Sequence, residues 1–517
     1  MRHYYYFLLV TILISLSSCR NDFSFEPSSG NLEFSKETVY LDTVFTNIGS
    51  STYTLKVYNR SNKDIKIPSV RLGEGENSKY RLMVDGMPGK VFNNVELLAK
   101  DSMYIFVETT INYNEYANPD AQYLYTDKIE FDYGANYQKV DLVTLVKDAY
   151  FIYPGRTNGI YEQVEAGIDN EGNILTTRGR NLNEVHPDNG NEFLWKKDKP
   201  YVIYGYAAVP TGKTLTVEAG ARIHFHAESG LIVQTGGSLK VDGSKSTTEA
   251  LENEVIFQGD RLEQDFSEIP GQWGTIWLRN GSTGHHLKNL TIKNAVVGLL
   301  TEGNDGTDET LKLTNVQIYN SANVGLLARN AHVKGDNVVI NKAGQAGLAC
   351  TYGGKYAFRQ STFANYWSRP NQVAVAVDNG PAEQPVALEA AQFDNCIIFG
   401  SSNISLSMSK NPAAAFNYKF NNCLIKFFDV AQQYANNSLY PIANTTDYAN
   451  CRIAVNSNSN SFKPEFKNTA KNQLNIGENS SARGYGVAVA NPFLEDILGN
   501  SRPNGGSDLG AYQYIPE

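Results

Sequence analysis

The sequence lacks an excess of positive charge. Its 517 residues include 45 Lys and Arg against 54 Asp and Glu, which gives a formal net charge of −9. A chain with this balance is not attracted as a whole to nucleic acid phosphates or to anionic lipid head groups. The charge therefore argues against nucleic acid as a partner.

An apolar run long enough to span a membrane is also missing near the N-terminus. The run over residues 4–16 is too short for a mature transmembrane helix, and it follows the basic residue Arg2 and precedes small residues, as in an export signal. Its end, LSSC, resembles a bacterial lipobox, in which the cysteine becomes the lipidated N-terminus. We expect a signal peptide over residues 1–19, lipidation at Cys19, and a polar tether over residues 20–30. The alternative is a signal peptide that happens to contain a cysteine.

The chain is poor in charged residues and rich in glycine and tyrosine. Charged residues make up 19% and hydrophobic residues 41%, with 43 Gly and 31 Tyr. This composition favours a body of strands and tight turns. Because one compact core does not suffice at this length, we expect two or three domains or an elongated repeat.

Residues 31–151 have a period-two pattern. Runs such as TVYLDTVF, STYTLKVYN, KYRLMVDG and SMYIFVETTI alternate apolar and polar residues between Gly, Asn and Asp turns. About seven such runs predict an antiparallel, immunoglobulin-like β-sandwich that serves as a spacer or adhesion module. Residues 152–199 are polar and weakly periodic, which indicates a connector or cap.

A different pattern covers residues 200–517. The template apolar-x-Asn-apolar-x-apolar recurs at intervals of about 20–35 residues, as expected for a stacked solenoid. Its copies are LKNLTI at Leu287, LTNVQI at Leu313, GDNVVI at Gly335, FRQSTF at Phe358, FDNCII at Phe393, FNNCLI at Phe420 and YANCRI at Tyr448. Upstream, strand-like segments about eight residues apart give a coil of about 24 residues. We predict a right-handed parallel β-helix with coils stacked about 4.8 Å apart.

The template aligns residues that should face the core of this solenoid. The first inward set is Leu290, Val316, Val338, Ser361, Cys396, Cys423 and Cys451, and the second follows two residues later as Ile292, Ile318, Ile340, Phe363, Ile398, Ile425 and Ile453. The Asn that precedes each residue of the first set should mark a turn. Its side-chain amide should hydrogen-bond to the equivalent amides along the axis. Stacked parallel side chains seldom reach disulfide geometry, so we expect free core thiols.

The coil pattern, GQWGTIWL at residues 271–278 and the ending with Asp508 to Tyr512 resemble Bacteroidota-type surface lipoproteins with a right-handed parallel β-helix of the pectin-lyase-like class. The resemblance covers residues 214–517 and the lipobox. It implies a cell-envelope location, with the membrane reached through the lipid anchor, and the fold, without an assigned reaction.

Catalytic signatures of β-helix lyases and hydrolases are missing from the sequence. Neither an Asp-Asp pair with Gly-His-Gly, nor Trp-Ile-Asp-His, nor Asp-Pro-His-Glu occurs. A loop with Glu302, Asp305, Asp308 and Glu309 offers carboxylates for Ca²⁺, but its spacing favours a solvated loop. His224 and His226 are expected to share the outward face, where two ligands are too few for a metal site. We expect no metal and no cofactor.

One aromatic and basic cluster suits contact with sugar rings and acidic groups. Aromatic faces beside Lys or Arg stack on such ligands, although aromatics that pack turns against the solenoid are the plainer interpretation. The candidate glycan-binding residues are Tyr352, Lys355, Tyr356, Tyr366, Trp367 and Arg369.

The sequence thus predicts a non-catalytic cell-envelope lipoprotein, lipid-anchored at the outer membrane. It would present a β-helix to a polysaccharide or an envelope protein. The alternative is a divergent polysaccharide lyase or hydrolase acting on uronate-containing polysaccharide.

Overall fold

The computed structural model describes residues 24–116, 122–168, 171–248, 250–307, 309–440, 446–456, 461–488, 493–502 and 508–516. The chain divides into two compact units, one ending at Asp148 and one running from Ala149 to Glu517. The described residues are all-β, since their helical segments are short 3-10 turns. No helix within these ranges is long and apolar enough to cross a membrane. The predicted signal peptide and Cys19 lie outside the described residues.

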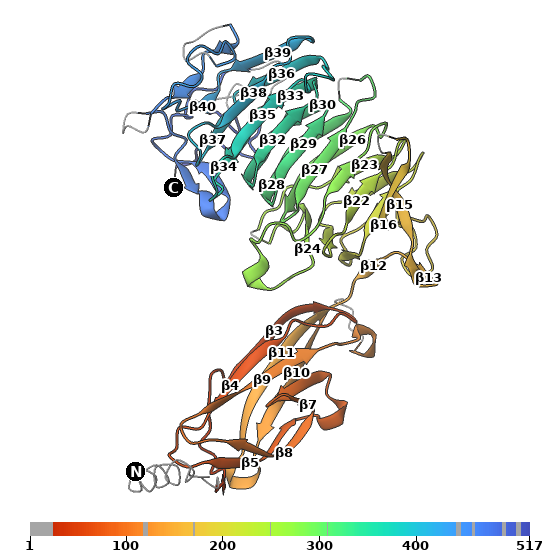
Figure 1. Ribbon diagram of the computed structural model, residues 1–517, viewed down its shortest axis with the longest axis vertical. Coiled ribbons are helices and arrows are strands. Elements are labelled where there is room, and N and C mark those ends of the chain that lie inside the picture. Colours follow the sequence, from red (N-terminus) through yellow and green to blue (C-terminus); the bar gives the residue numbers. More distant parts are fainter. Residues whose placement is uncertain are drawn as a thin grey trace, which may run out of the picture. The chain divides into compact units, whose positions relative to one another are not determined.

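The first unit contains two sheets (Figure 1). One sheet comprises β1 (Glu26–Pro27), β3 (Thr38–Phe45), β5 (Ile65–Leu72), β8 (Val91–Leu97), β10 (Gln122–Phe131) and β11 (Gln138–Lys147). The other comprises β2 (Glu33–Phe34), β4 (Tyr53–Tyr58), β6 (Tyr80–Val84), β7 (Met87–Gly89) and β9 (Ser102–Thr109). The 3-10 turns η1 (Gly75–Asn77), η2 (Tyr113–Tyr116) and η3 (Gly134–Asn136) lie in the connections.

Both sheets contribute to one hydrophobic core. Leu41 of β3 and Ile129 of β10 pack in the same cluster as Val57 of β4 and Ile105 of β9. Their strands alternate buried and exposed residues, as a sheet with one solvated face requires. The run TVYLDTVF coincides with β3, and the other quoted runs contain β4, β6 and β9.

The second unit is built mainly from parallel strands in two long sheets. The larger sheet comprises β12 (Tyr150–Ile152), β17 (Leu194–Trp195), β18 (Tyr201–Ile203), β20 (Thr214–Glu218), β21 (Arg222–Phe225), β23 (Ser238–Asp242), β24 (Val255–Gly259), β26 (His285–Lys293), β28 (Leu311–Ser321), β30 (His332–Asp336), β31 (Val339–Ala343), β33 (Gly354–Arg359), β34 (Thr362–Asn365), β36 (Leu388–Asp394), β37 (Ile397–Gly400), β39 (Phe416–Asn421), β40 (Leu424–Lys426), β41 (Tyr448–Ala449) and β42 (Arg452–Ala454).

The smaller sheet of this unit comprises β15 (Gln163–Ile168), β16 (Ile174–Asn181), β19 (Tyr206–Val209), β22 (Gly230–Val233), β25 (Ile276–Leu278), β27 (Val297–Glu302), β29 (Val324–Arg329), β32 (Ala346–Thr351), β35 (Val373–Asp378) and β38 (Leu406–Ser409). Figure 1 shows its strands side by side from β22 to β38. Short additional elements are β13 (Arg156–Thr157), β14 (Ile160–Tyr161), β43 (Phe466–Asn468), β44 (Gln473–Ile476), η4 (Gln264–Phe266) and η5 (Thr469–Lys471).

Successive turns of the chain place their strands in the same order. After β30, a corner at Asn337 leads into β31, and a loop then leads to β32 in the smaller sheet. The next turn repeats this order as β33, β34 and β35, and each strand pairs in parallel with its counterpart one turn earlier. Equivalent residues of neighbouring turns are therefore in register.

The segment at residues 152–199, predicted as a connector or cap, contributes strands to both sheets. β15 and β16 form an antiparallel pair, and β16 then continues in parallel with β19. β17 pairs in parallel with β20. The unit boundary precedes residue 151 because β12 pairs with β18 of the second unit.

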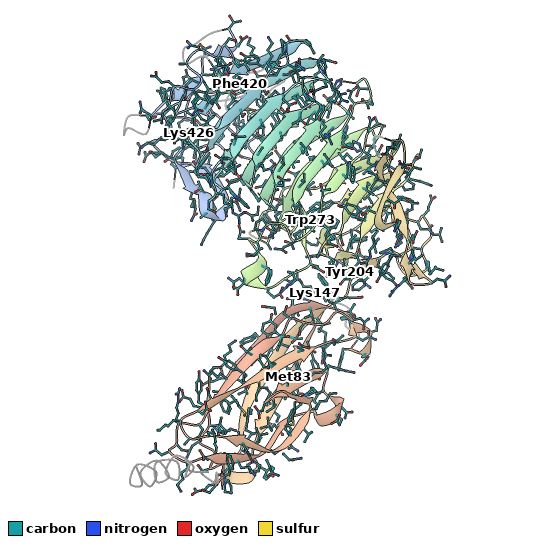
Figure 2. All side chains as sticks on the ribbon, viewed as in Figure 1. Met83, Lys147, Tyr204, Trp273, Phe420 and Lys426 are labelled. Atoms are coloured by element: carbon teal, nitrogen blue, oxygen red, sulfur yellow. The ribbon has the colours of Figure 1, made fainter. Side chains whose placement is uncertain are left out.

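The inward positions predicted from the template form the core. Ile292, Ile318, Ile340, Phe363, Ile398, Ile425 and Ile453 pair in this order across consecutive turns. The first residues of four template copies stack as rings, with centroid distances of 5.6 Å for Phe358–Phe393, 5.0 Å for Phe393–Phe420 and 5.1 Å for Phe420–Tyr448. Figure 2 labels Phe420 and the buried Trp273, which lie in different parts of this core.

The four cysteines within the described residues are free, as predicted. Cys350, Cys396 and Cys423 are buried and Cys451 is partly buried. The Cys423 thiol donates to the carbonyl oxygen of Phe393 at 3.3 Å, and burial raises its pKa well above the usual value. These thiols act as small core side chains.

The corner residue of each template copy has a left-handed backbone conformation. The values of φ are 45° for Asn289, 54° for Asn315 and 52° for Asn337, and Gln360, Asn395, Asn422 and Asn450 fall in the same range. Asparagine tolerates this region better than most residues. The Asn315 amide donates to Asn289 Oδ1 at 3.0 Å, and the Asn337 amide donates to Asn315 Oδ1 at 3.0 Å. The predicted amide stacking is thus present over three turns.

The C-terminal segment covers the outward side of the strands that follow these corners. Ile497 and Tyr512 pack in one cluster with Tyr319, Val339 and Ala364. Farther along, Leu509 and Ile476 pack with Ile397, Phe399 and Leu424. The buried Arg502 guanidinium donates to Asn337 Oδ1 at 3.1 Å. This side of the stack is therefore occupied by the chain itself.

Candidate functional site

The strands that precede the corners carry charged side chains on their outward side. On β23, Leu239 and Val241 are buried, whereas Lys240 and Asp242, which alternate with them, are exposed. The same alternation occurs in the strands paired with it, because a strand directs successive side chains to opposite faces. We define the charged face as the outward residues of β20, β23, β26, β28, β30, β33, β36 and β39.

One row of this face is basic in four consecutive turns. Lys240 pairs with His286, His286 with Lys312, and Lys312 with Lys334. The Lys312 and Lys334 side chains are 38% and 36% exposed. Because neighbouring strands lie about 4.8 Å apart, these four side chains form a regular ladder of basic groups. We call it the basic row.

A second row runs beside it and is more mixed. Asp242 pairs with Lys288, and Asp336 pairs with Arg359, which in turn pairs with Asp394. Asp336 is largely buried and accepts two hydrogen bonds from Arg359, at 2.6 and 2.9 Å. Asp394 accepts from the Gln392 amide at 2.8 Å and from the Asn421 amide at 3.2 Å. The carboxylates in this part of the face are therefore already bonded.

Glu309 lies between two members of the basic row. It contacts Lys334 through a short ion pair and Lys312 at 3.6 Å. The hydrogen bond from Lys334 lowers the pKa of Glu309 below its usual value, against the opposing effect of burial. The carboxylate is therefore charged at neutral pH, and it orders the two lysines while it offsets part of their charge.

The candidate glycan-binding residues do not form one surface. Lys355 lies on β33 in register with His332, and Tyr352 lies just before this strand with its ring centre 5.1 Å from the Arg329 guanidinium. Tyr356 is fully buried, and its hydroxyl donates to the Gly353 carbonyl at 2.7 Å. The prediction that Tyr356 presents a ring to a ligand is wrong, because alternation along β33 directs it into the core.

The other three candidates follow β34. Tyr366 is partly buried, and its ring centre lies 6.0 Å from that of Phe466 in the C-terminal segment. Trp367 is partly buried and Arg369 is exposed. A corner separates β33 from β34, so these residues and Lys355 stand at opposite ends of the strand pair. Of the six candidates, only Lys355 lies on the charged face, because Tyr352 precedes β33 and contacts Arg329 of β29 in the smaller sheet.

The other candidates for metal binding are engaged in separate contacts. Glu302 accepts from Trp277 Nε1 at 2.9 Å, whereas Asp305 accepts from Thr307 and Thr310. Burial acts to raise the pKa of Asp305, but these hydrogen bonds and one from Thr283 outweigh it and lower the pKa. Asp308 lies outside the described residues.

The two histidines of the predicted outward pair differ in exposure. His224 is buried, with Nδ1 3.2 Å from the Gly259 carbonyl oxygen, whereas the more exposed His226 contacts Asp260 at 2.8 Å. Ile223 and Phe225 face the core, as the prediction for the two histidines assumed, but His224 is covered whereas His226 is exposed. Over the described part of the chain, no three His, Cys, Asp or Glu side chains are grouped to hold a metal ion.

The basic row was not predicted, although the sequence contains a signal for it. A lysine follows a buried residue in SLKVDG, TLKLTN and HVKGDN, once in each of three turns. The intervening turn has His286 in this position. Insertions between strands make the intervals unequal, so the row emerges only once the register is known.

Comparisons with known proteins give no family for this chain. No protein-family model and no curated protein matches it. Among solved structures, the PapD-like domain 7 of human CEP192 is 11% identical, with a TM-score of 0.15 over 26% of this chain and 94% of that chain.

Two chaperones are similar to a comparable extent. The E. coli chaperone DraB is 12% identical, with a TM-score of 0.16 over 28% of this chain and 61% of that chain. The periplasmic chaperone SfaE is 13% identical, with a TM-score of 0.15 over 23% of this chain and 58% of that chain. Likenesses this slight support no inference about function, so function is inferred from the chain's own residues.

Proposed function

We propose that this protein is a non-catalytic cell-envelope lipoprotein that binds an anionic glycan on the charged face. The observation that supports this function most directly is the basic row, three lysines and one histidine in register on a protein whose net charge is −9. Local concentration of one charge on an oppositely charged molecule indicates a specific surface for an anionic ligand.

The proposal includes the finer architecture. The first unit would be an immunoglobulin-like sandwich and the second a right-handed parallel β-helix of the pectin-lyase-like class, as in Bacteroidota-type surface lipoproteins. Parallel pairing of strands with their counterparts one turn earlier, as in β30–β33, β31–β34 and β32–β35, supports the β-helix. The right hand follows from the general preference of parallel crossover connections.

A lipid anchor at Cys19 would hold the protein at the outer membrane. The lipobox-like sequence and the preceding apolar run support this part of the proposal. Several acyl chains on one residue hold a protein stably at a bilayer. The charged face would then meet polysaccharide of the envelope.

The spacing of the basic row suits a polymer with repeated acidic groups. Basic groups about 4.8 Å apart can each approach a carboxylate or sulfate of successive sugar units. Lys355 adds a positive side chain in a neighbouring row, whereas Arg359 is engaged by Asp336. An extended uronate-containing or sulfated chain is therefore the ligand class that the face fits.

Around Lys312 and Lys334, the state of the carboxylates supports binding rather than catalysis, whereas Glu218 and Asp242 are exposed farther along the face. A glycoside hydrolase requires a carboxylic acid and a carboxylate that are both available to the substrate. On the charged face, Asp336 is bonded to Arg359, Asp394 to two amides, and Glu309 to two lysines. Such ion pairs hold the lysine and arginine side chains in place at the surface.

The test uses the full chain in detergent with polygalacturonate and alginate as anionic probes and dextran as the neutral one. We compare the triple variant Lys240→Gln, Lys312→Gln, Lys334→Gln with the matched control Lys36→Gln, Lys63→Gln, Lys100→Gln in the first unit, which changes net charge equally. Three exposed ion pairs at about 0.5 kcal/mol each predict about tenfold weaker binding of an anionic probe for the first variant alone. Equal losses in both variants would contradict the assignment of the face.

The same incubations, with added Ca²⁺, are followed by unsaturated-product absorbance and by reducing ends. Turnover that disappears on replacing Asp336 or Arg359 would show that the chain is a lyase or hydrolase instead. Binding without turnover supports the proposal.

A further inference from the structure

The first unit has a row of exposed apolar side chains on the outward side of its smaller sheet. On β9, Ile105 and Val107 are buried, whereas Tyr104 and Phe106 are 50% and 37% exposed. On the neighbouring β6, Met83 is 41% exposed, and Figure 2 labels this residue. Exposed aromatic and apolar residues gathered on one face mark an interaction site more often than isolated ones do.

These side chains line up across four strands. Phe106 of β9 is opposite Thr54 of β4 on one side and Met83 of β6 on the other, and Met83 is opposite Pro88 of β7. A hollow of about 320 Å³ lies here, lined by Thr52, Arg81, Leu82, Met83, Pro88, Phe106 and Glu108. This volume is at the lower end of the range of small-molecule sites.

The aromatic surface continues beyond the hollow. The Tyr104 and Phe106 rings are 6.3 Å apart with planes 23° from parallel. Lys56 Nζ lies 5.1 Å from the Tyr104 ring centre and 5.3 Å from that of Tyr58. The Lys56 ammonium thus contacts two rings, and one of them, Tyr104, neighbours Phe106 of the hollow.

One side of the hollow is polar. Arg81 and Glu108 are opposite each other on β6 and β9, with 3.6 Å between Arg81 Nη2 and Glu108 Oε2. Thr52 donates to Glu108, and Arg81 also donates to Thr110 Oγ1 at 3.2 Å. Both members of the pair are about half exposed, at 50% and 43%. A donor and an acceptor therefore stand side by side next to an aromatic ring.

We propose that this hollow binds a pyranose unit of a neutral glycan. A pyranose has an apolar face of C–H groups that packs on a ring such as Phe106, and adjacent hydroxyls that each donate and accept a hydrogen bond, as the Arg81–Glu108 pair requires. The second sugar of the chain packs on Tyr104. A second copy of this protein is disfavoured as the occupant, because the centre of a protein interface is depleted of charged pairs. The site is independent of the charged face.

The test uses the full chain in detergent and four neutral probes: cellohexaose, laminarihexaose, mannohexaose and chitohexaose. Saturation-transfer NMR measures binding to the wild type and to the double variant Tyr104→Ala, Phe106→Ala. We expect at least one probe to bind and to bind at least tenfold more weakly to the double variant. The matched control Tyr40→Ala, Leu124→Ala removes exposed side chains of the other sheet and should change affinity less than twofold.

Further variants distinguish this hollow from the charged face and from a general loss of folding. Arg81→Met should weaken the same probe at least threefold, and the triple lysine variant of the charged face should leave it unchanged. Should the double variant fail to fold, Phe106→Leu keeps apolar bulk without a ring and is expected to weaken binding in the same way. Binding to none of the four probes, or affinity retained within twofold in the ring variants, overturns the proposal. So does a dimer in sedimentation that Phe106→Leu dissociates.

Discussion

Replacement of Asn315 should destabilise the second unit by two separable effects. This residue occupies a corner with φ of 54°, donates its amide to Asn289 and accepts from Asn337. Asn315→Ala removes the amide and leaves alanine in the left-handed conformation. Alanine adopts this conformation less readily than asparagine does, because it has no polar side chain to bond locally. Asn315→Gly removes the same amide but relieves the backbone. The pair of variants therefore distinguishes the hydrogen bonds from the conformation.

The loss in free energy of unfolding depends on which hydrogen-bond partners Asn289 and Asn337 keep when the Asn315 amide is removed. Asn289 Oδ1 loses the donor in a buried position, which costs about 1–3 kcal/mol. Asn337 still donates to the Glu495 carbonyl at 3.0 Å, so its loss is nearer to 1 kcal/mol. We expect about 2–4 kcal/mol for Asn315→Gly, and about 1 kcal/mol more for Asn315→Ala because of the left-handed conformation.

Tryptophan fluorescence during urea unfolding measures these differences. All four tryptophans, Trp195, Trp273, Trp277 and Trp367, belong to the second unit, so the signal reports this unit alone. The transition midpoint is compared rather than a fitted free energy, because stacked turns need not unfold in one step. A midpoint for Asn315→Ala equal to or above that of Asn315→Gly would refute the conformational part. Midpoints near the wild type for both would refute the role of the amide stack.

Further predictions concern protonation, thiols and the anchor. Burial lowers the pKa of His285 to about 4, and its Nδ1 accepts a hydrogen bond from the Leu239 N–H at 3.1 Å. Between about pH 4 and 6.5, the unfolded chain therefore binds more protons than the folded chain does. Stability of the second unit should fall as pH drops through this window, by up to about 3 kcal/mol, and His285→Gln should flatten the fall in pH-dependent urea titrations. Cys423→Ser should lower the free energy of unfolding by about 1–3 kcal/mol because it buries a hydroxyl in an apolar core. The wild-type thiol should react with a maleimide only after denaturation. A thiol that stays unreactive in urea without reductant would contradict this. Cys19→Ala should abolish membrane association and the mass increase of lipidation; a product of unchanged mass in the membrane fraction would show that the lipobox interpretation is wrong.

The repeated template is enough to predict the core of the second unit. Asn and the residues around it recur because each turn needs a left-handed corner followed by an inward side chain, and these needs select residue types directly. The same template predicts the register, since it aligns Ile292 with Ile318, and these two residues pair in the structure. Alternation likewise indicates β3 and β9 in the first unit.

The surface is harder to predict because it depends on the register of several strands at once. Tyr356 and Lys355 are adjacent in sequence, yet one is in the core and the other on the charged face. Composition groups them as aromatic and basic, while alternation along β33 separates them. The basic row joins residues from four turns separated by unequal insertions. The hollow beside Phe106 joins residues from three strands whose antiparallel pairing is not encoded in one local pattern.

The C-terminal segment has a consequence for the order in which the protein is completed during synthesis. Arg502 contacts Asn337 across 165 residues of chain, and Ala511 donates to Thr362 across 149. The chain emerges N-terminus first from the ribosome and from an export channel alike, so the strands of the turns can pair before the segment that covers Tyr319, Val339 and Ala364 has emerged. Until then, this apolar strip remains open to other chains. A premature stop near the end would therefore leave a nearly complete stack that aggregates, although every turn of its core is present.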